Sequence, residues 1–445
     1  MIVAVRREVR PLLTLAVPVI LAEVGWMAMG LVDTIMVGRL GPAAIGAAGM
    51  GSSVFTAIVI FGMGLMLGLD TFVSQAYGAR RLDECLAWLH HGIWLALIVG
   101  PVLMVATWLT ATTLDVWGLH PAIRVLVRPY LRDISLGALP LLLYAGFRRY
   151  LQGLHVVKPV MFALITANLV NAAGNWVLIY GHLGLPAMGV QGSAWATDLA
   201  RAYMAAFLYI TIRIVHRRRG DAHPQVPWRP DWSRMRRLIS LGLPAASQVA
   251  LEVGGFAAAT AMAGKLDPIS SGGHQIAMNL AGLAFMVPLG LASASAVRVG
   301  HALGAGDSLR ARRAGWTALV IGATLMLVIG ASLLTFREPL VRLFTSDVRL
   351  IAIGVQLLAI AAGFQLFDGV QAIATGVLRG AGDTRTPVLF NVVGYWVLGL
   401  PVGYSLCFRY GWGVRGLWFG LSAGLILVSL ALTVAWTRKA RRIGS

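Results

Sequence analysis

Charged side chains are scarce in this sequence. Lys, Arg, Asp and Glu make up 12% of its 445 residues, whereas soluble domains carry about 25%. Hydrophobic residues make up 58%, and the mean hydropathy is +0.76. A chain of this composition lacks the polar side chains that a water-soluble surface needs, so we expect it to lie in a lipid bilayer.

The sequence also has little that would support catalysis. It contains no Gly-x-x-x-x-Gly-Lys-Ser/Thr phosphate loop, no His-Glu-x-x-His zinc motif and no Cys-x-x-Cys pair. Its two cysteines, Cys85 and Cys407, fall on opposite sides of the expected membrane, so we expect no disulfide. An enzyme embedded in the membrane is an alternative class, but we find no catalytic residues for it. We therefore expect neither enzymatic activity nor a cofactor.

Acidic residues are the scarcer charge. The 37 Lys and Arg exceed the 18 Asp and Glu and give a formal net charge of +19, which in a soluble protein would suggest nucleic-acid binding. On the spans given below, however, 26 of the 37 lie on the side that holds both termini, 10 lie on the other, and Arg201 is the one basic residue well inside a span. The positive-inside rule then places both termini in the cytoplasm, and we expect no nucleic-acid partner. Arg124, Arg128 and Arg132 are exceptions, because they fall on the expected outer side.

Long apolar runs are abundant. We predict twelve membrane-spanning helices, each about 20 or more residues long, which is the length that crosses a hydrocarbon core of roughly 30 Å. They cover residues 12–37, 44–72, 86–112, 127–150, 159–181, 188–214, 238–263, 270–297, 313–335, 350–378, 387–408 and 413–436. The predicted fold class is therefore an all-α integral membrane protein with six spans in each half.

The two halves resemble each other. Three segments of the first half recur 226 positions later with similar residues, and two more recur with small shifts. The pairs are Leu15–Pro18 with Leu241–Pro244, Gly38–Pro42 with Gly264–Pro268, Gln75–Ala79 with His301–Ala305, Leu151–Gly153 with Leu378–Gly380, and Gly189–Gly192 with Gly413–Gly416. Since six spans is an even number, both copies have the same orientation, which makes a parallel repeat. Internal repeats of this kind are typical of transporters.

The repeat predicts the domain organisation. We expect a first six-helix lobe over residues 1–215, a basic cytoplasmic linker over 216–236 and a second six-helix lobe over 237–445. We interpret the charge of the linker as a topology signal. Docking onto anionic lipids or a partner is the alternative.

Ionisable residues within spans indicate function, because they are costly to place in a bilayer. In the second half, Glu252 and Asp368 have similar expected depths. Polar or aromatic residues share helical faces with them or with each other; they are Gln248, Phe364, Gln371, Gln275 and Asn279. Two carboxylates with amides around them suit a proton or a cation such as Na⁺. The alternative is that these residues only satisfy each other across packed helices.

A second candidate site lies in the first half. Asp33 is near the outer end of the first span, and Asn171 and Asn175, one turn apart in the fifth span, reach a comparable depth. A carboxylate facing two amides predicts another proton or cation site, although asparagines also join helices structurally and Asp33 has an alternative role as a capping residue. At equivalent repeat positions Asp33 is matched by Ala259 and Glu252 by Trp26. The two lobes are therefore expected to act differently on the ion.

Several motifs resemble the multidrug and toxic compound extrusion (MATE) transporters, over essentially the whole chain. They are Val32–Gly38, Gln75–Gly78, Gly273–Asn279 and Leu378–Thr384. The resemblance implies two six-helix lobes and export of organic cations, drugs or other amphipathic compounds in exchange for Na⁺ or H⁺. Within the family the chain is most similar to the bacterial NorM-like branch, because Glu252 and Asp368 match its second-lobe acidic pair. Asp33 and Asn171 match residues of the first-lobe site.

Two positions depart from the family pattern. Some members have aspartate at the position of Asn175, and some NorM-like members have tyrosine at the position of Phe364. Both departures favour Glu252 and Asp368 as the coupling residues, with Na⁺ as one candidate ion.

We expect a functional monomer in the bacterial plasma membrane, in contact with lipids, that takes small amphipathic or cationic substrates by alternating access. The alternative is a flippase or exporter of a lipid-linked saccharide, which would need a strongly cationic cleft.

Overall fold

The computed structural model describes residues 2–117, 120–218 and 226–443, so residues 219–225 of the basic linker lie outside the described part of the chain. Within it the protein is built from helices. The first half comprises α1 (Ile2–Gly38), α2 (Pro42–Met66), α3 (Gly68–Gly78), α4 (Leu82–Thr112), α5 (Pro121–Ile134), α6 (Ala138–Gly153), α7 (Lys158–Tyr180) and α8 (Val190–Arg218), with short 3₁₀ turns at Leu114–Trp117 and Ser135–Gly137.

The second half is also helical. It comprises α9 (Trp232–Ala263), α10 (Pro268–Gly304), α11 (Ser308–Thr335), α12 (Arg337–Arg342), α13 (Val348–Gly380), α14 (Arg385–Asn391), α15 (Leu400–Tyr404) and α16 (Val414–Ile443). The π-helical stretch Val392–Gly399 joins α14 to α15, and a second one, Ser405–Arg409, continues α15, so that Arg385–Arg409 form one longer element.

The predicted spans are present as helices. Eleven helical elements within the described residues are long and apolar enough to cross a membrane. The predicted span 127–150 corresponds to α5 and α6, which differ from the prediction in being separated by the 3₁₀ turn Ser135–Gly137. The close approach of Asp198 explains why Gly137 stands in this turn, because a Cβ there would overlap the carboxylate. The fold class predicted from the sequence is confirmed.

The chain forms two compact units. Unit 1 contains Met1–Ile20 and Ser247–Ser445, and unit 2 contains Leu21–Ala246. Helices α1 and α9 therefore each contribute to both units, and each changes unit two residues after a proline, Pro18 or Pro244. The changes occur at equivalent positions of the repeat, again 226 residues apart.

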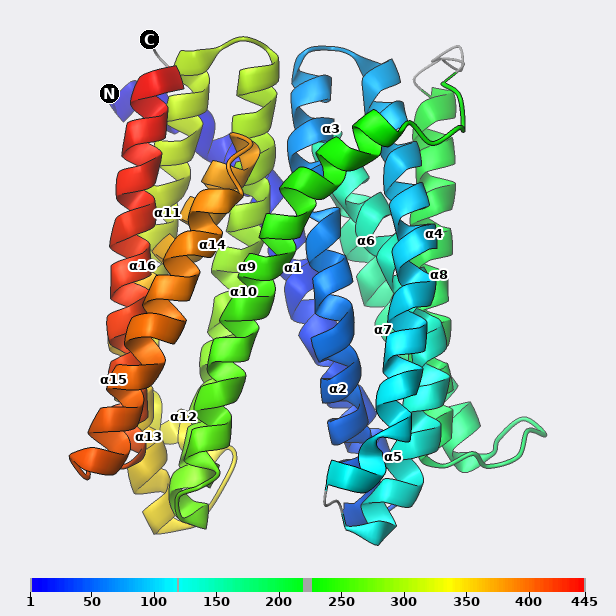
Figure 1. The fold of residues 1–445 in the computed structure, drawn as a ribbon, viewed down its shortest axis with the longest axis vertical. Coiled ribbons are helices and arrows are strands. Elements are labelled where there is room, and N and C mark those ends of the chain that lie inside the picture. The colour runs from blue at the N-terminus through cyan, green and yellow to red at the C-terminus, as the bar shows by residue number, and fades with distance from the viewer. Residues whose placement is uncertain (1, 118–119, 219–225, 444–445) are drawn as a thin grey trace. The chain divides into compact units, whose positions relative to one another are not determined.

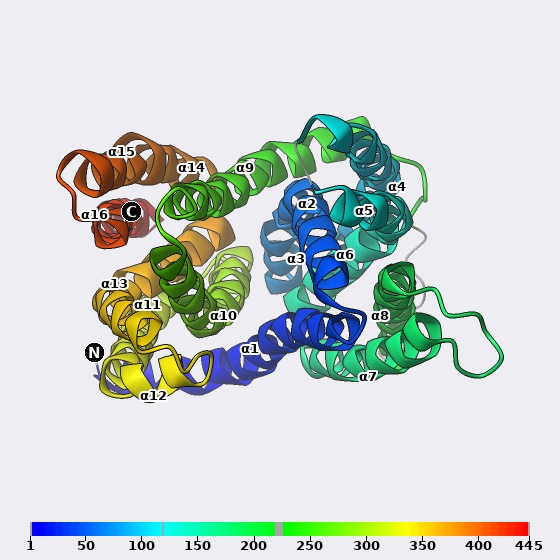
Figure 2. The ribbon, with the colours of Figure 1, turned by 90° about the horizontal axis from the view of Figure 1, so that it is seen from below.

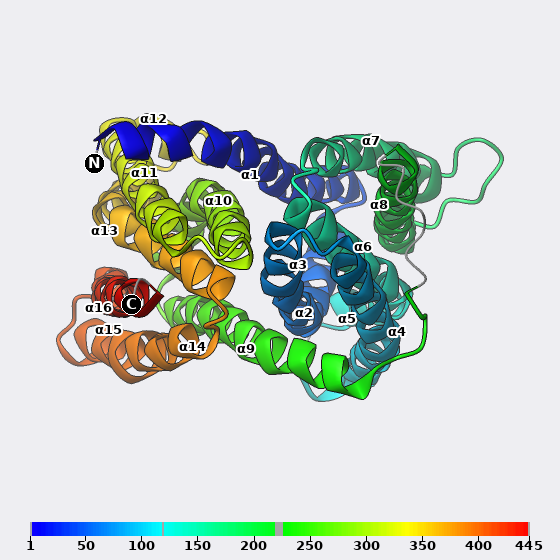
Figure 3. The same ribbon diagram turned by 90° about the horizontal axis from the view of Figure 1, so that it is seen from above.

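Unit 1 is centred on α13. This helix packs against α10, α11 and α16, as the end views show (Figure 2, Figure 3). The start of α1 and the end of α16 lie at the same end of the unit (Figure 1), as an even number of spans requires. Close packing is visible at Gly290 of α10, where a Cβ would lie 2.8 Å from the Ile20 backbone nitrogen.

In unit 2, α8 packs against α5, α6 and α7, and α4 packs against α6. The first part of α9 belongs to the same apolar core, to which it contributes Met235, Leu238 and Ala246. Gly68 of α3 allows this packing, because a Cβ there would lie 3.0 Å from the Leu238 carbonyl oxygen. Small residues allow membrane helices to approach closely, which is the main source of their packing energy.

Candidate coupling sites in the two units

The acidic residues of unit 1 lie on two neighbouring elements. Gln248 and Glu252 are one turn apart on α9, and the Gln248 amide nitrogen donates a 2.6 Å hydrogen bond to a Glu252 carboxylate oxygen. Asp368 lies on α13, is 5% exposed, and has one carboxylate oxygen without a hydrogen-bond partner in the described part of the chain. The Glu252 and Asp368 carboxylates are within electrostatic range of each other. The pair predicted from the sequence is therefore brought together.

Gln371 and Tyr395 complete this cluster. Gln371 lies one turn after Asp368, interacts with Glu252 and accepts a 3.0 Å hydrogen bond from the Tyr395 hydroxyl. Both side chains are fully buried. Sequence reasoning missed Tyr395, which lies in the first π-helical stretch, where the usual helical spacing of side chains does not hold.

A small cation or a proton binds to carboxylate oxygens that hydrogen-bond donors do not already occupy. Na⁺ prefers oxygen ligands, and the cluster offers carboxylate oxygens of Glu252 and Asp368. Among the described residues no group of three or more His, Cys, Asp or Glu side chains forms a candidate metal site.

The other predicted neighbours in unit 1 are placed differently. Phe364 is buried, and its ring packs 5.8 Å from the ring of Trp418 on α16. Gln275 and Asn279 lie on an exposed face of α10, and no described hydrogen bond joins them to Glu252 or Asp368. Their role as ion-site or substrate-site neighbours stays a prediction.

A second polar chain in unit 1 was not expected from the sequence. The Trp418 indole N–H donates to His274 Nδ1 at 3.0 Å, and His274 Nε2 lies 3.0 Å from the Thr260 hydroxyl. Because an indole nitrogen can only donate, Nδ1 must be unprotonated, which leaves the proton on Nε2. The Thr260 hydroxyl in turn donates to the Phe256 carbonyl. His274 is thereby held neutral between two fixed partners.

The first-lobe site is present in unit 2. Asp33 on α1 accepts hydrogen bonds from the amide nitrogens of Asn171, at 3.0 Å, and Asn175, at 2.6 Å. Its other oxygen accepts a 3.0 Å hydrogen bond from Thr197 of α8. Thr197 was missed by sequence reasoning, since a single threonine in an apolar helix gives no signal.

The two sites differ in how many donors their acids receive. Asp33 receives three, whereas Glu252 receives one from Gln248 and also interacts with Gln371, and Asp368 keeps an oxygen without a partner in the described part of the chain. A carboxylate surrounded by donors has little capacity left for a cation. Asp368, in contrast, retains a carboxylate oxygen that can accept a further contact.

Buried arginines are more numerous than the sequence indicated. Arg201, which appeared to be the only basic residue deep in a span, forms a 2.9 Å ion pair with Asp198 and lies over the Phe55 ring. Arg148 pairs with Glu23 inside unit 2, and Arg298 pairs with Glu8 inside unit 1. Each of these three arginines is thus paired with an acid, although Glu8 also pairs with Arg310.

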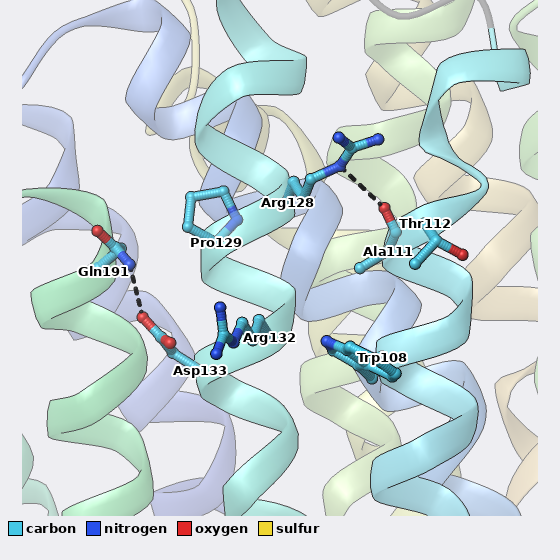
Figure 4. Close-up of a pocket in the computed structure, with 8 residues that line it drawn as sticks. All are labelled: Trp108, Ala111, Thr112, Arg128, Pro129, Arg132, Asp133 and Gln191. Carbon is cyan, nitrogen blue, oxygen red and sulfur yellow. Dashed lines mark hydrogen bonds between the residues drawn. The ribbon is translucent and has the colours of Figure 1, made fainter.

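A cavity of about 310 Å³ lies in unit 2 between α4, α5 and α8 (Figure 4). It is lined by Trp108, Ala111, Thr112, Arg128, Pro129, Arg132, Asp133 and Gln191, and contains none of the predicted coupling residues. Arg128 pairs with Asp115 at 2.6 Å, and Arg124 pairs with the same acid at 3.3 Å. Two of the three arginines that departed from the charge bias are therefore paired with an acid.

One segment has the spacing of a hydrolase nucleophile. Gly420–Gly424 fits Gly-x-Ser-x-Gly, a pattern that in hydrolases forms a turn between a strand and a helix. Here it lies inside α16, and the Ser422 hydroxyl donates to the Trp418 carbonyl one turn earlier. The structural context of a nucleophile is not met.

Comparison with known proteins identifies the family. The family model described as MatE matches the chain twice, over residues 18–177 and 244–405. The second match begins 226 positions after the first, which is the offset of the repeated motifs. The chain belongs to the MatE family.

The chain is similar to known relatives over nearly its whole length, which supports its membership of the MatE family. It is 37% identical over 443 residues to the probable multidrug resistance protein NorM of Mesorhizobium japonicum, covering 98% of this chain and 95% of that protein. It is 35% identical over 444 residues to the multidrug resistance protein PmpM of Pseudomonas aeruginosa, covering 98% and 93%. The resemblance to the NorM-like branch is thereby confirmed.

Solved structures confirm the MatE fold. The crystal structure of the eukaryotic MATE transporter AtDTX14 superposes with a TM-score of 0.88 at 20% identity, covering 99% of both chains. An outward-facing MATE transporter of the MOP superfamily superposes with a TM-score of 0.87, also at 20% identity, covering 98% of this chain and 96% of that chain. The protein is a multi-pass membrane protein with this fold.

Proposed function

We propose that this protein is a secondary active antiporter that exports organic cations, drugs or other amphipathic compounds in exchange for Na⁺ or H⁺. The observation that carries the proposal is the acidic cluster of unit 1. Glu252 and Asp368 lie in membrane-spanning helices and interact electrostatically, and one Asp368 oxygen has no hydrogen-bond partner among the described residues. Intramembrane acids of this kind mark ion pathways in transporters.

Coupling requires that the ion binds two access states with different affinity. We propose that Na⁺ or H⁺ enters from outside and binds at Glu252 and Asp368. Its binding displaces the substrate to the outside and favours the inward-facing state. Gln248, Gln371 and Tyr395 position the carboxylates. Asp33, with Asn171, Asn175 and Thr197, supplies a second, donor-rich proton or cation site in unit 2.

The proposed setting is the bacterial plasma membrane, with both termini in the cytoplasm, residues 1–215 and 237–445 as the two duplicated lobes, and a monomer as the working form. The names of the relatives, multidrug resistance proteins NorM and PmpM, support drug-like substrates. An exporter of a lipid-linked saccharide is less well supported, because Arg148, Arg201 and Arg298 are each paired with an acid and offer no free cationic group for a pyrophosphate.

The test is efflux from proteoliposomes that contain the purified protein. Ethidium or norfloxacin efflux is measured under an imposed Na⁺ gradient and, separately, under an imposed pH gradient. Efflux under one gradient supports drug antiport and identifies the ion. Absence of efflux under both, with protein shown to be correctly inserted, contradicts the proposal.

A further inference from the structure

Two ion pairs occupy equivalent positions of the repeat with their charges exchanged. In unit 1, Glu8 near the start of α1 pairs with Arg310 in the first turn of α11, at 3.3 Å. In unit 2, Arg234 in the first turn of α9 pairs with Glu84 in the first turn of α4. Position 234 is 226 residues after position 8, and position 310 is 226 residues after position 84. The same two repeat positions therefore form both pairs, with opposite signs.

Both contacts are well formed. Arg234 donates two parallel hydrogen bonds of 2.9 Å to the two Glu84 oxygens, which is the strong bidentate arrangement of arginine with a carboxylate. Glu8 is 9% exposed and also accepts a hydrogen bond from the buried Arg298. These pairs are therefore partly shielded from water, unlike most surface ion pairs.

The positions of the two arginines are unfavourable for the helices that carry them. Arg234 and Arg310 both lie in the first turn of a helix, where the macrodipole disfavours positive charge. Arg234 also has a local ion pair with Asp231 at 3.6 Å, but the cross-helix pairs are the contacts that both arginines share.

Each pair joins one sequence half to the other. Helix α1 belongs to the first half and α11 to the second; α9 belongs to the second half and α4 to the first. If a first helix packed instead on its own half, Glu8 would face Glu84 and Arg234 would face Arg310. Both of these contacts are repulsive, so the four charges favour only the exchanged pairing.

We infer that these four charges are an interlock that directs the first helix of each half onto the opposite half. The segments exchanged are the parts of α1 up to Ile20 and of α9 up to Ala246, which belong to the unit formed mainly by the other half. The two copies of the repeat have similar apolar surfaces. The inversion of charge allows each copy to distinguish its own first helix from the first helix of the other copy.

The experiment compares two double charge reversals in the full chain. Arg234→Glu with Glu84→Arg leaves both cross-half contacts attractive but makes the own-half contacts attractive as well. Glu84→Arg with Arg310→Glu makes both cross-half contacts repulsive and both own-half contacts attractive. The two double variants share one substitution and have the same net charge. All the changed residues lie at the starts of helices on the same expected side of the membrane, so the charge signals for membrane insertion are matched. The measured quantities are the yield of folded monodisperse protein in detergent, its melting temperature and drug efflux.

We expect the single variants Arg234→Glu and Glu84→Arg to lower the ratio of folded to unfolded protein by roughly five- to thirtyfold. The first double should recover only part of this loss, because it restores the cross-half pair without disfavouring own-half packing, and the second should be worse than Glu84→Arg alone. Arg236→Glu is the control, because Arg236 is an exposed residue of the same helix without a described ion pair. Equal behaviour of the two doubles, or singles no worse than Arg236→Glu, would overturn the inference.

Discussion

The Tyr395 hydroxyl donates a 3.0 Å hydrogen bond to the side-chain oxygen of Gln371, and both residues are fully buried. This bond determines which end of the Gln371 amide faces the tyrosine, so the nitrogen end is left for the carboxylate side of the cluster. Gln371 interacts with Glu252 and lies one turn from Asp368. A tyrosine outside the acidic pair thereby orients an amide within it.

Removal of that hydroxyl should weaken ion binding without abolishing transport. We expect Tyr395→Phe to lower the apparent affinity for the coupling ion by about fivefold, since one buried hydrogen bond contributes about 1 kcal/mol, with a smaller change in maximal rate. The measurement is efflux rate against ion concentration in proteoliposomes. Tyr404→Phe is the matched control, because Tyr404 is an exposed tyrosine of the same region. An unchanged affinity in Tyr395→Phe would show that Gln371 needs no such orientation.

Neutral replacements of the acidic pair should separate function from stability. We expect Glu252→Gln and Asp368→Asn to reduce ion-driven efflux to the background of empty liposomes. Because Asp368 is buried with an oxygen that lacks a partner, its neutralisation should leave the melting temperature equal or higher. Glu338→Gln, a change of an exposed acid on α12, should retain efflux. Full coupled efflux in both cluster variants would remove these residues from the mechanism.

The sequence predicted those residues that share a face of one regular helix. Gln248 with Glu252, and Asn171 with Asn175, follow the spacing of one turn and were found in hydrogen-bonded pairs. The contact of Asp33 with the two asparagines was suggested by depth alone and is present in the structure.

The remaining site residues could not be predicted, for physical reasons. His274 points into the core while its neighbour Gln275 lies on an exposed face, and a helix that is apolar all around gives no pattern to choose between them. Tyr395 lies in a π-helical stretch, which shifts the side-chain direction. The pair of Glu23 and Arg148 joins residues 125 positions apart, and nothing local in either segment indicates the other.

The first-lobe site offers a test of how many carboxylates it tolerates. Asn175 donates to Asp33 at 2.6 Å, so Asn175→Asp would place two carboxylates at hydrogen-bonding distance, where a cation between them relieves the repulsion. We expect Na⁺ to raise the melting temperature of this variant by more than that of the unmodified protein. The variant with Asp33→Asn and Asn175→Asp has a single carboxylate again and should lose the Na⁺ response. A response in neither variant would contradict this account of the site.

The chain from Trp418 through His274 to Thr260 should contribute to stability. Trp418→Phe removes the only described donor to His274 Nδ1, and leaving a buried acceptor unpaired costs about 1–3 kcal/mol. We therefore expect a melting temperature several degrees lower, whereas Trp412→Phe, at an exposed tryptophan before α16, should have little effect. Adding His274→Leu to Trp418→Phe removes the unpaired nitrogen, so the double variant should lose less stability than the two single changes predict together. Simple additivity of the two losses would show that the hydrogen bond is not what couples these residues, and that the packing of the Trp418 ring accounts for its contribution.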